Sequence, residues 1–372
     1  LLSLNEDIGE TGGASSSGPP GASENLPVPL PVLLAAPPEP LPEPQQKENP
    51  WAELQDEALA PRVPKGPPVI PATRFWPSGP SENIVVPPKV STKKDEQYAG
   101  AYVKVPEPGG YDWVVSFDLN SLYPHLIMQY NISPETLVER RHGAVSVDKL
   151  LEQEAEIDGE YAVCANGAQY RKDIHGFLPE MMQRIYDDRK IYKGKMLTAK
   201  RQNESAPTVQ LQKDIARYNN IQMARKIQLN SAYGAIGNQY FRYFNLANAE
   251  AITLSGQVSI RWIENKVNEY LNKLLKTEDK DYVIASDTDS IYICLDLLVN
   301  SVFDVQNVPK ERIVNFLDAA CKTKIEPFID KAYQELATYV NAYEQKMFMK
   351  RENIADRGVW TAKKRYILNV WD

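Results

Sequence analysis

The sequence predicts an α+β fold that follows a long N-terminal segment without regular structure. Twenty of the 28 prolines fall in residues 1–90, and the same residues hold 11 Asp and Glu but only 5 Lys and Arg. Beyond them, β-rich and helical stretches alternate without a regular βαβ repeat, which favours α+β over a doubly wound parallel sheet. The remaining part, about 280 residues, is long enough for one large core or two subdomains.

Residues 1–80 are predicted to be a disordered, acidic and proline-rich tail. Proline fixes φ and removes a backbone donor, and only three aromatic side chains, Trp51, Phe75 and Trp76, occur in the first 90 residues. The composition leaves two further hypotheses open: a short helix over residues 51–60, and a proline-rich ligand for an aromatic groove of a partner.

The cysteines and the apolar runs bound the class of protein. Cys164, Cys294 and Cys321 are far apart and odd in number, so they form neither a disulfide framework nor a zinc spacing. This usage is typical of a reducing, intracellular setting. The longest apolar run, residues 26–38, is short and broken by prolines, and no signal peptide is visible. We therefore expect no membrane partner.

The first regular elements beyond the tail are a buried strand and a helix. Residues 111–119 (YDWVVSFDL) are β-rich and mostly apolar, and residues 121–129 then turn helical. Around Asn166-Gly167, a dipeptide that suits a two-residue turn, residues 161–165 and 168–172 predict a short hairpin.

The later elements are mainly helical. Residues 178–201 and 209–232 predict two long helices joined by a short connection, which indicates an antiparallel helical hairpin. Residues 257–275 predict an amphipathic helix. The remaining expectations are two β-rich runs around an acidic turn in residues 282–295, helical structure over residues 313–343 and a final strand pair over residues 359–370.

Three aspartates mark the candidate catalytic site. Asp287 and Asp289 flank Thr288 at a tight turn between two apolar runs, and Asp118 ends the first buried strand. Each feature alone is more often a solvated turn or a helix N-cap. Together they indicate a divalent-metal site, because neighbouring carboxylates repel unless a cation lies between them. Pairs of metals bridged by such acids are used for displacement at phosphorus.

The predicted helical hairpin is strongly basic. Residues 184–226 hold 11 Lys and Arg against 4 Asp and Glu. Arg189 and Lys193 are spaced i, i+4 on one helix; Lys226 and Asn230 repeat this spacing on the other, with Tyr233 close by. A basic helix is usually a solvated one, but bases concentrated on two facing helices beside a metal site favour a clamp for a triphosphate.

Four motifs, in order, resemble those of family B DNA polymerases. SFDLNSLYPHLIMQYNISPET is similar to motif A, ARKIQLNSAYGAIGN to motif B, ASDTDSIYI to motif C, and TAKKRYIL to the lysine-rich motif that follows them. The resemblance runs from about residue 82 to the end of the sequence. It points to the replicative polymerases of T-even-type bacteriophages and their cyanophage relatives.

This resemblance implies a palm subdomain, an antiparallel sheet backed by helices, over residues 81–177 and 236–372, with helical fingers inserted over residues 178–235. It implies that Asp118, Asp289 and the Leu119 carbonyl hold two Mg²⁺ ions, or Mn²⁺, beside Asp287. The residues implied to bind the incoming dNTP are Ser121, Leu122, Tyr123, Arg189, Lys193, Lys226, Asn230, Tyr233 and Gly234. Those implied to bind primer–template DNA are Lys363, Lys364, Arg365 and Tyr366.

Some of these positions carry a second interpretation. Tyr123, which would exclude a 2′-hydroxyl, could be an ordinary core tyrosine. The sequence departs from the family pattern at Ala285 and Ser286 before the motif C acids, at His125 in motif A, and at Lys350. An accessory role for Glu352, which is retained, is a further hypothesis.

The expected function is template-directed DNA polymerase chemistry in the cytoplasm of an infected bacterial host. The sequence begins with Leu1, and we expect neither an exonuclease before the predicted palm nor a thumb after it, so weak DNA binding and poor processivity are expected of this chain alone. The alternative is a non-catalytic or split-polymerase fragment that acts with chains carrying those parts, or with a sliding clamp. A metal-dependent nuclease is disfavoured, because Lys226, Asn230 and Tyr233 match a nucleotide-selecting motif.

Overall fold

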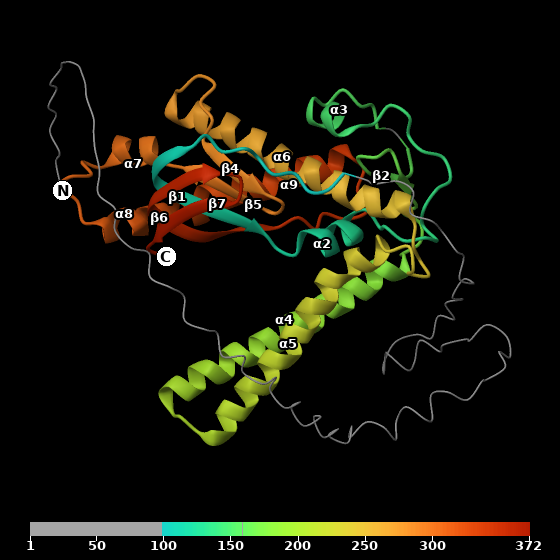
Figure 1. Cartoon of the computed structure of the whole chain (residues 1–372), viewed down its shortest axis with the longest axis horizontal. Coiled ribbons are helices and arrows are strands. Elements are labelled where there is room, and N and C mark those ends of the chain that lie inside the picture. Colours follow the sequence, from blue (N-terminus) through green and yellow to red (C-terminus); the bar gives the residue numbers. More distant parts are fainter. Residues whose placement is uncertain (1–98, 158) are drawn as a thin grey trace, which may run out of the picture. The chain divides into compact units, whose positions relative to one another are not determined.

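The computed structural model describes residues 99–157 and 159–372 (Figure 1). They belong to a compact unit that spans Lys65–Asp372, and a second unit, Leu1–Pro64, lies outside the described residues. The predicted disordered tail over residues 1–80 and the short helix over residues 51–60 also lie outside them.

An antiparallel sheet with strand order β4-β5-β1-β6-β7 forms the centre of the described part. Its strands are β1 (Gly109–Leu119), β4 (Val283–Asp287), β5 (Ser290–Cys294), β6 (Met349–Ala362) and β7 (Arg365–Val370). A separate hairpin consists of β2 (Ala162–Val163) and β3 (Gln169–Tyr170). Together with the helices, this sheet confirms the predicted α+β class.

Helices contact one face of the sheet. The helices are α2 (Leu122–Gln129), α3 (Val147–Leu151), α4 (Phe177–Ser205), α5 (Val209–Ile236), α6 (Leu246–Leu275), α7 (Asp296–Val302), α8 (Lys310–Ala320) and α9 (Glu326–Tyr339), with a π-helical turn, Cys321–Ile325, between the last two. Alternate strand residues, among them Val115, Phe117 and Ile293, lie in the main core on the face that α6, α7, α8 and α9 contact. Their neighbours Val114 and Tyr292 lie in a smaller cluster on the other face.

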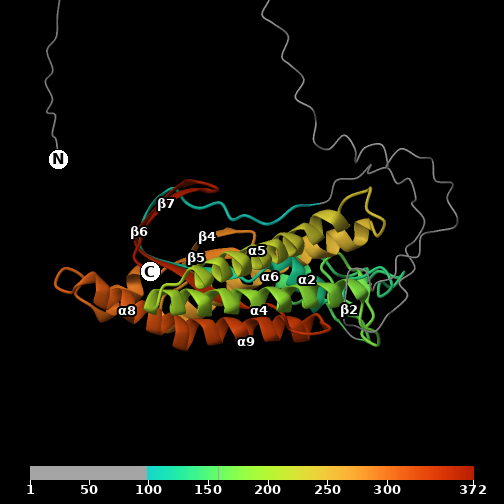
Figure 2. The ribbon, with the colours of Figure 1, turned by 90° about the horizontal axis from the view of Figure 1, so that it is seen from below.

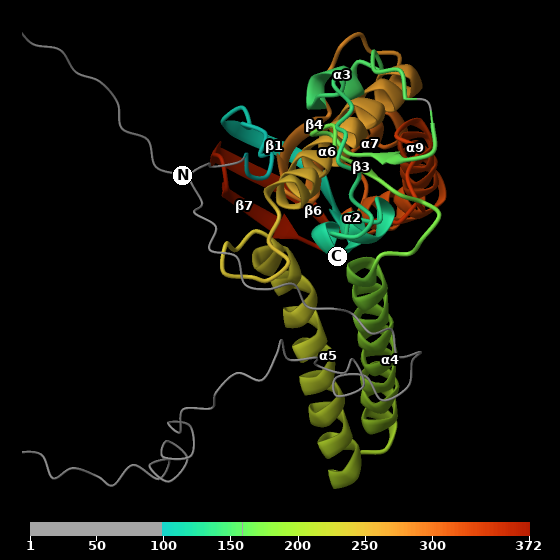
Figure 3. The same cartoon turned by 90° about the vertical axis from the view of Figure 1, so that its right-hand side faces the viewer.

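Helices α4 and α5 pack side by side and extend away from the sheet (Figures 1 and 3). Thr208 begins α5, because its hydroxyl accepts a hydrogen bond from the Leu211 amide at 3.1 Å. Buried side chains concentrate at the root of this helical hairpin, as Ile185 and Leu229 illustrate. The root is therefore anchored, while the distal turns are solvated. Within the described residues, no helix is both long and apolar enough to cross a membrane.

The ribbon of β6 and β7 curves back over the face of the sheet opposite the main core (Figure 2). Trp360 of β6 packs on Tyr292 of β5, with ring centroids 5.6 Å apart. Lys364, in the turn between β6 and β7, pairs with Asp287 at the end of β4, with 3.0 Å between the ammonium nitrogen and a carboxylate oxygen. The curvature therefore brings the tip of the ribbon to the sheet end at which β1 and β4 finish.

The predicted elements occur in the predicted order, with differences at their bounds. The turn at Asn166-Gly167 is confirmed: Gly167 has φ +76°, and a Cβ there would lie 2.6 Å from the His142 carbonyl oxygen. Helix α6 begins 11 residues before the predicted start, because Asn245 accepts hydrogen bonds from the amides of Ala247 and Asn248. The final strand pair also begins earlier than predicted, at Met349. Helices α3 and α7 were not predicted.

Candidate active site

The three aspartates of the acidic cluster, Asp118, Asp287 and Asp289, meet at one end of the sheet. Asp118, near the end of β1, is the register partner of Ser290 in β5. The Leu119 amide donates a hydrogen bond to the Asp289 carbonyl at 2.8 Å, which fixes the end of β1 against the turn between β4 and β5. Strand pairing thus brings residue 118 to residues 287 and 289, which are far from it in sequence.

The negative charges of the acidic cluster are not balanced by the positive charges near them. Burial, with the nearby charges of Asp289 and Glu352, raises the pKa of Asp118 to about 7 from 3.8, and Lys226 opposes this effect. Burial likewise raises the pKa of Asp289. The charges of Asp287 and Glu352 raise it further, whereas the charge of Lys364 lowers it. The carboxylates therefore repel one another at neutral pH, and a bound cation would relieve that repulsion.

Glu352 joins the acidic cluster through an irregularity of β6. Ser116 of β1 pairs with Asn353, whereas the next residue, Phe117, pairs with Arg351, so Glu352 is the extra residue of a β-bulge. Bulges re-aim a side chain and are frequent beside active sites. Its charge acts on both acids named above. From the sequence, an accessory role for Glu352 was only a hypothesis. The signal available for the bulge was the break in the strand alternation of apolar and polar residues in FMKREN.

The acids could hold a metal only together with other ligands. Among the residues that the structure describes, no group of three His, Cys, Asp or Glu side chains is placed to hold a metal ion. Mg²⁺ is usually bound by one or two carboxylates, completed by substrate phosphates and water. Asp118 and Asp289, with the backbone of Leu119 beside them, fit such an incomplete oxygen-donor site.

Lysines of two separate elements face the acidic cluster. Lys226 of α5 acts electrostatically on Asp118, and Lys364 of the β6–β7 turn pairs with Asp287. Of the other residues predicted to contact DNA, Tyr366 shares a hydrogen bond of 2.6 Å with the Tyr292 hydroxyl, while Lys363 and Arg365 are exposed.

The predicted nucleotide-binding loop lies between β1 and α2. Ser121 caps α2 with φ 53° and ψ 59°, a left-handed conformation that is uncommon for a residue other than glycine. The first amides of a helix have no partner within it, so this end of α2 offers donors to an anion. Arg189 of α4 donates a long hydrogen bond of 3.5 Å to the Ser121 hydroxyl, which brings the helical hairpin to this loop.

The remaining predicted nucleotide contacts lie on α2, α4 and α5, and Tyr123 is on α2. The rings of Tyr123 and Tyr233 pack with centroids 4.5 Å apart. No atom outside the immediate backbone lies within 4 Å of a Cβ built on Gly234, so packing does not require glycine there. Asn230 and Lys193 are exposed on the helical hairpin.

His125 and Tyr186 join the loop to the helical hairpin. The Nδ1 of His125 lies 3.0 Å from the Ser121 carbonyl oxygen, and because a carbonyl only accepts, Nδ1 carries the proton. The His125 and Tyr186 rings meet edge to face, with centroids 4.6 Å apart, and Asn120 donates a hydrogen bond to the Tyr186 hydroxyl. Burial lowers the pKa of His125, which favours a neutral ring. The sequence offered no signal for Tyr186.

Two further departures from the family pattern are Ser286 and Lys350. Ser286 is buried, and its hydroxyl has no hydrogen-bond partner in the described residues. Lys350 is the register partner of Asp118, but its ammonium pairs with Glu326 at 2.8 Å.

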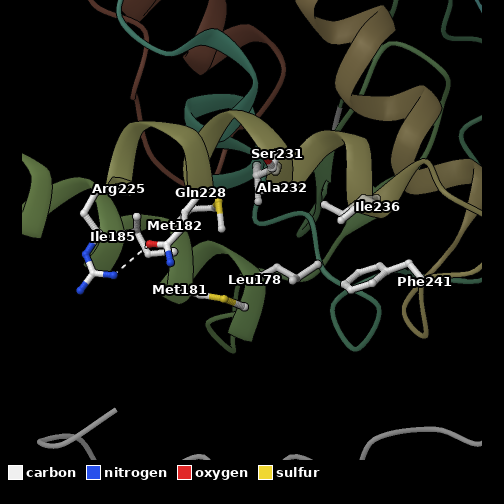
Figure 4. Close-up of a pocket in the computed structure, with 12 residues that line it drawn as sticks. Leu178, Met181, Met182, Ile185, Arg225, Gln228, Ser231, Ala232, Ile236 and Phe241 are labelled. Carbon is white, nitrogen blue, oxygen red and sulfur yellow. Dashed lines mark hydrogen bonds between the residues drawn. The ribbon is translucent and has the colours of Figure 1, made fainter. Parts of the chain in front are cut away.

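A cavity of about 420 Å³ lies at the root of the helical hairpin (Figure 4). Its lining is mostly apolar and includes Leu178, Met182 and Ile236, with Arg225 and Gln228 hydrogen-bonded to each other on α5. Helical spacing places Lys226 on a different side of α5. The cavity is therefore separate from the acidic cluster.

Comparison with known proteins gives consistent matches. Residues 79–372 match the model of DNA polymerase family B. The chain is 36% identical over 326 residues to the DNA-directed DNA polymerase of Escherichia phage RB69, which covers 74% of this chain and 36% of the phage protein. It is also 36% identical over 344 residues to the DNA-directed DNA polymerase of Enterobacteria phage T4, which covers 78% of this chain and 38% of the phage protein.

A more distant match is the DNA polymerase delta catalytic subunit of Candida albicans. It is 30% identical over 257 residues, which covers 68% of this chain and 22% of the yeast protein. The chain thus spans a little over a third of the length of the phage relatives that it matches.

Proposed function

The chain belongs to DNA polymerase family B, and we propose that it transfers a nucleotide from a dNTP to a primer 3′-hydroxyl under the direction of a template. The observation that carries the proposal is the Asp118 carboxyl. Its pKa of about 7 reflects burial beside Asp289 and Glu352, opposed by Lys226 alone among the named charges. A site that concentrates desolvated acids in this way is suited to binding cations with a phosphate substrate.

The subdomains follow from this assignment. Residues 81–177 and 236–372 would form the palm, and residues 178–235 the fingers. The antiparallel sheet and the projecting helical hairpin support this division. The proline-rich tail over residues 1–80 stays outside the proposed catalytic part.

Asp118, Asp289 and the Leu119 carbonyl would hold two Mg²⁺ ions, replaceable by Mn²⁺, and these ions would activate the 3′-oxygen and stabilise charge at phosphorus. Asp287 would stay beside them; in the free chain it pairs with Lys364 at 3.0 Å. The contribution of the protein is then to position these oxygens in a partly buried site before substrate arrives.

The nucleotide would lie between α2 and the helical hairpin. Arg189, Lys193 and Lys226 would neutralise its triphosphate, and the amides of Ser121 and Leu122 would bind it at the start of α2. Tyr123, held by its packing on Tyr233, would exclude a 2′-hydroxyl. The residues proposed to line the new base pair are Asn230, Tyr233 and Gly234.

Primer–template DNA would lie along the curved β6–β7 ribbon. Lys363, Lys364, Arg365 and Tyr366 are proposed to contact it, and Lys364 would exchange Asp287 for a phosphate or base edge. The hydrogen bond from Tyr366 to Tyr292 supports this role, because it anchors the ribbon tip beside the acidic cluster.

The alternative that we propose is that the chain acts as one part of a split polymerase. Its partners would be chains that supply a thumb and an exonuclease, together with a sliding clamp. Either function would be carried out in the cytoplasm of an infected bacterial host.

Primer extension separates these functions. The full chain is incubated with primer–template, dNTPs and Mg²⁺, alone and with candidate partner chains. We expect incorporation that Asp289→Asn abolishes, and that Asp296→Asn, an acid of α7 paired with Lys280, leaves unchanged. Incorporation only in the presence of a partner would favour the split polymerase. No Asp289-dependent incorporation under any of these conditions would overturn both.

A further inference from the structure

We propose that Lys104 is a positioning residue that holds the acidic turn of Asp287 and Asp289 in register. This role rests on the proposed polymerase function. Lys104 ends a short segment, residues 100–104, which we name the strap. The strap lies outside the four motifs that carry the family resemblance.

The strap pairs with the exposed edge of the sheet at the acidic turn. Strand β4 is at one end of the strand order, so β5 is its only strand neighbour among the described strands. On its other side, Val103 forms an antiparallel bridge with Asp287. The Lys104 amide donates to the Ser286 carbonyl at 3.1 Å, and the Thr288 amide donates to the Tyr102 carbonyl at 3.0 Å.

The turn needs this support because its backbone is strained. Thr288, between the two aspartates, has φ 60°, and a β-branched residue adopts such a conformation only when its surroundings enforce it. The hydrogen bond from the Thr288 amide to the strap is one such restraint. Movement of the strap would therefore be transmitted directly to the turn.

Helix α6 fixes the position of the strap through a polar stripe. Gln257 donates a hydrogen bond of 2.6 Å to the Gly100 carbonyl. One turn later, the Arg261 guanidinium lies 5.6 Å from the centroid of the Tyr102 ring. Glu264, a further turn along, accepts from Lys104. Residues spaced in this way lie on one helical face, so the stripe and the strap run side by side.

Lys104 ties the strap to two further segments. Its ammonium nitrogen lies 2.6 Å from a carboxylate oxygen of Glu264 and 2.6 Å from one of Asp281, just before β4. The side chains of Lys104 and Glu264 are only 16% and 11% exposed. Burial alone would lower the pKa of Lys104, but its hydrogen bonds to Asp281 and Glu264 raise it, so the ammonium is charged at neutral pH.

Loss of this charge would release the strap. Glu264 would remain buried without its cation, and its second oxygen already has no hydrogen-bond partner in the described part of the chain. A buried carboxylate left alone moves toward water or becomes protonated. The strap would then separate from α6 and leave the edge of β4 unsupported beside Asp287.

The test measures Mn²⁺ binding by the full chain, from the free-ion signal in electron paramagnetic resonance. Asp289→Asn defines the part of the binding that belongs to the acidic cluster. Lys104→Met is expected to weaken that part about tenfold, because residues that orient metal ligands typically contribute 10–100-fold to affinity. Lys104→Arg, which keeps the charge, should recover most of the loss.

A matched control separates positioning from general stability. Lys266 lies on α6, as Glu264 does, and its side chain is 22% exposed and pairs with Glu269 and Glu335. Lys266→Met therefore removes a comparable ammonium group at another place. It should lower the thermal unfolding temperature but leave Mn²⁺ affinity unchanged. If Lys104→Met does not fold, Glu264→Gln replaces it, with an expected loss of Mn²⁺ affinity of up to about tenfold.

Two results would overturn the role of Lys104. The first is that folded Lys104→Met, or Glu264→Gln in its place, binds Mn²⁺ as tightly as the wild type does. The second is that Lys266→Met weakens Mn²⁺ binding as much as Lys104→Met does. Absence of any Asp289-dependent Mn²⁺ binding in the wild type would instead contradict the metal site of the proposed function. The two failures are therefore distinguishable.

Discussion

Asp118 has a pKa that determines how its ionisation affects stability. A carboxyl group whose pKa is higher in the folded chain stabilises the fold most below the unfolded value. For Asp118 these values are about 7 and 3.8. Its contribution is therefore fully present below pH 4, decreases as pH rises and is lost above about pH 7. Without divalent cations, the ionised site should destabilise the protein.

Asp118→Asn should consequently become more stabilising, relative to the wild type, as pH increases from 4 to 7. After allowance for solvent screening, we expect the difference in unfolding free energy to grow by roughly 1–2 kcal/mol and then to level off. Urea unfolding in EDTA at pH 5, 6, 7 and 8 measures this difference. Mg²⁺ at pH 8 should stabilise the wild type more than the variant. A difference independent of pH would contradict the assignment.

At the scale of elements, the contact between α2 and α4 depends on two rings. The His125 ring donates a hydrogen bond to the Ser121 carbonyl and packs edge to face on Tyr186 of α4. A change in either residue should therefore be felt at the left-handed Ser121. Edge-to-face aromatic pairs contribute about 0.5–1.5 kcal/mol beyond the area that they bury.

His125→Ala and Tyr186→Leu should each weaken dNTP binding about two- to tenfold, and the double variant should lose less than the sum of both. Calorimetric titration of the full chain with dNTP and Mg²⁺ measures all four dissociation constants. Tyr186→Phe, which keeps the ring, should lose less than Tyr186→Leu. His175→Ala, whose ring stacks on Tyr343 elsewhere, is the control and should bind normally. Strictly additive losses would show that the rings act independently.

The fold and much of the site were predictable because their signals are local. The hydrophobic strand before Asp118, the Asn166-Gly167 turn and the two long helices all carry periodicity or turn residues that predict one structure. The beginning of β6 was not predictable. Met349 and Arg351 face the helices before the bulge at Glu352, and Ile354 faces them after it, so the alternation changes phase within the strand.

Contacts between distant segments gave no signal in the sequence. Lys104 and Glu264 lie 160 positions apart and meet only through the packing of the strap on α6. In the sequence, Tyr186 looks like any other residue of a basic helix, and only the fold brings it into contact with His125. Side-chain pairs of this kind follow from tertiary structure and have no periodic pattern of their own.

Across the whole molecule, positive and negative charge are separated. The chain has a formal net charge of −7, yet the helical hairpin is basic and Lys226 of it acts on Asp118, while Lys364 faces the acidic cluster from another element. Net charge is therefore a poor guide to nucleic-acid binding in this protein. What matters is the number of lysines and arginines that can replace counterions on phosphate.

Primer–template affinity should accordingly fall as salt rises, and Lys363→Ala should make the slope of log K against log salt shallower by about 0.9. Fluorescence anisotropy with labelled DNA over a range of KCl concentrations gives both slopes. Lys276→Ala, which removes an exposed lysine at the end of α6, should leave the slope unchanged. Equal slopes for wild type and Lys363→Ala would argue against a phosphate contact at the ribbon tip.

The strand order of the sheet has a consequence for folding. Among the described strands, β1 is the first to be synthesised and lies in the middle of the sheet, but its two neighbours begin only at Ser290 and Met349. The edges of this apolar strand therefore stay unpaired until those residues have been synthesised, a state that is prone to aggregation. Such distant pairings form slowly. Co-expression of chaperones should therefore raise the soluble yield of this protein.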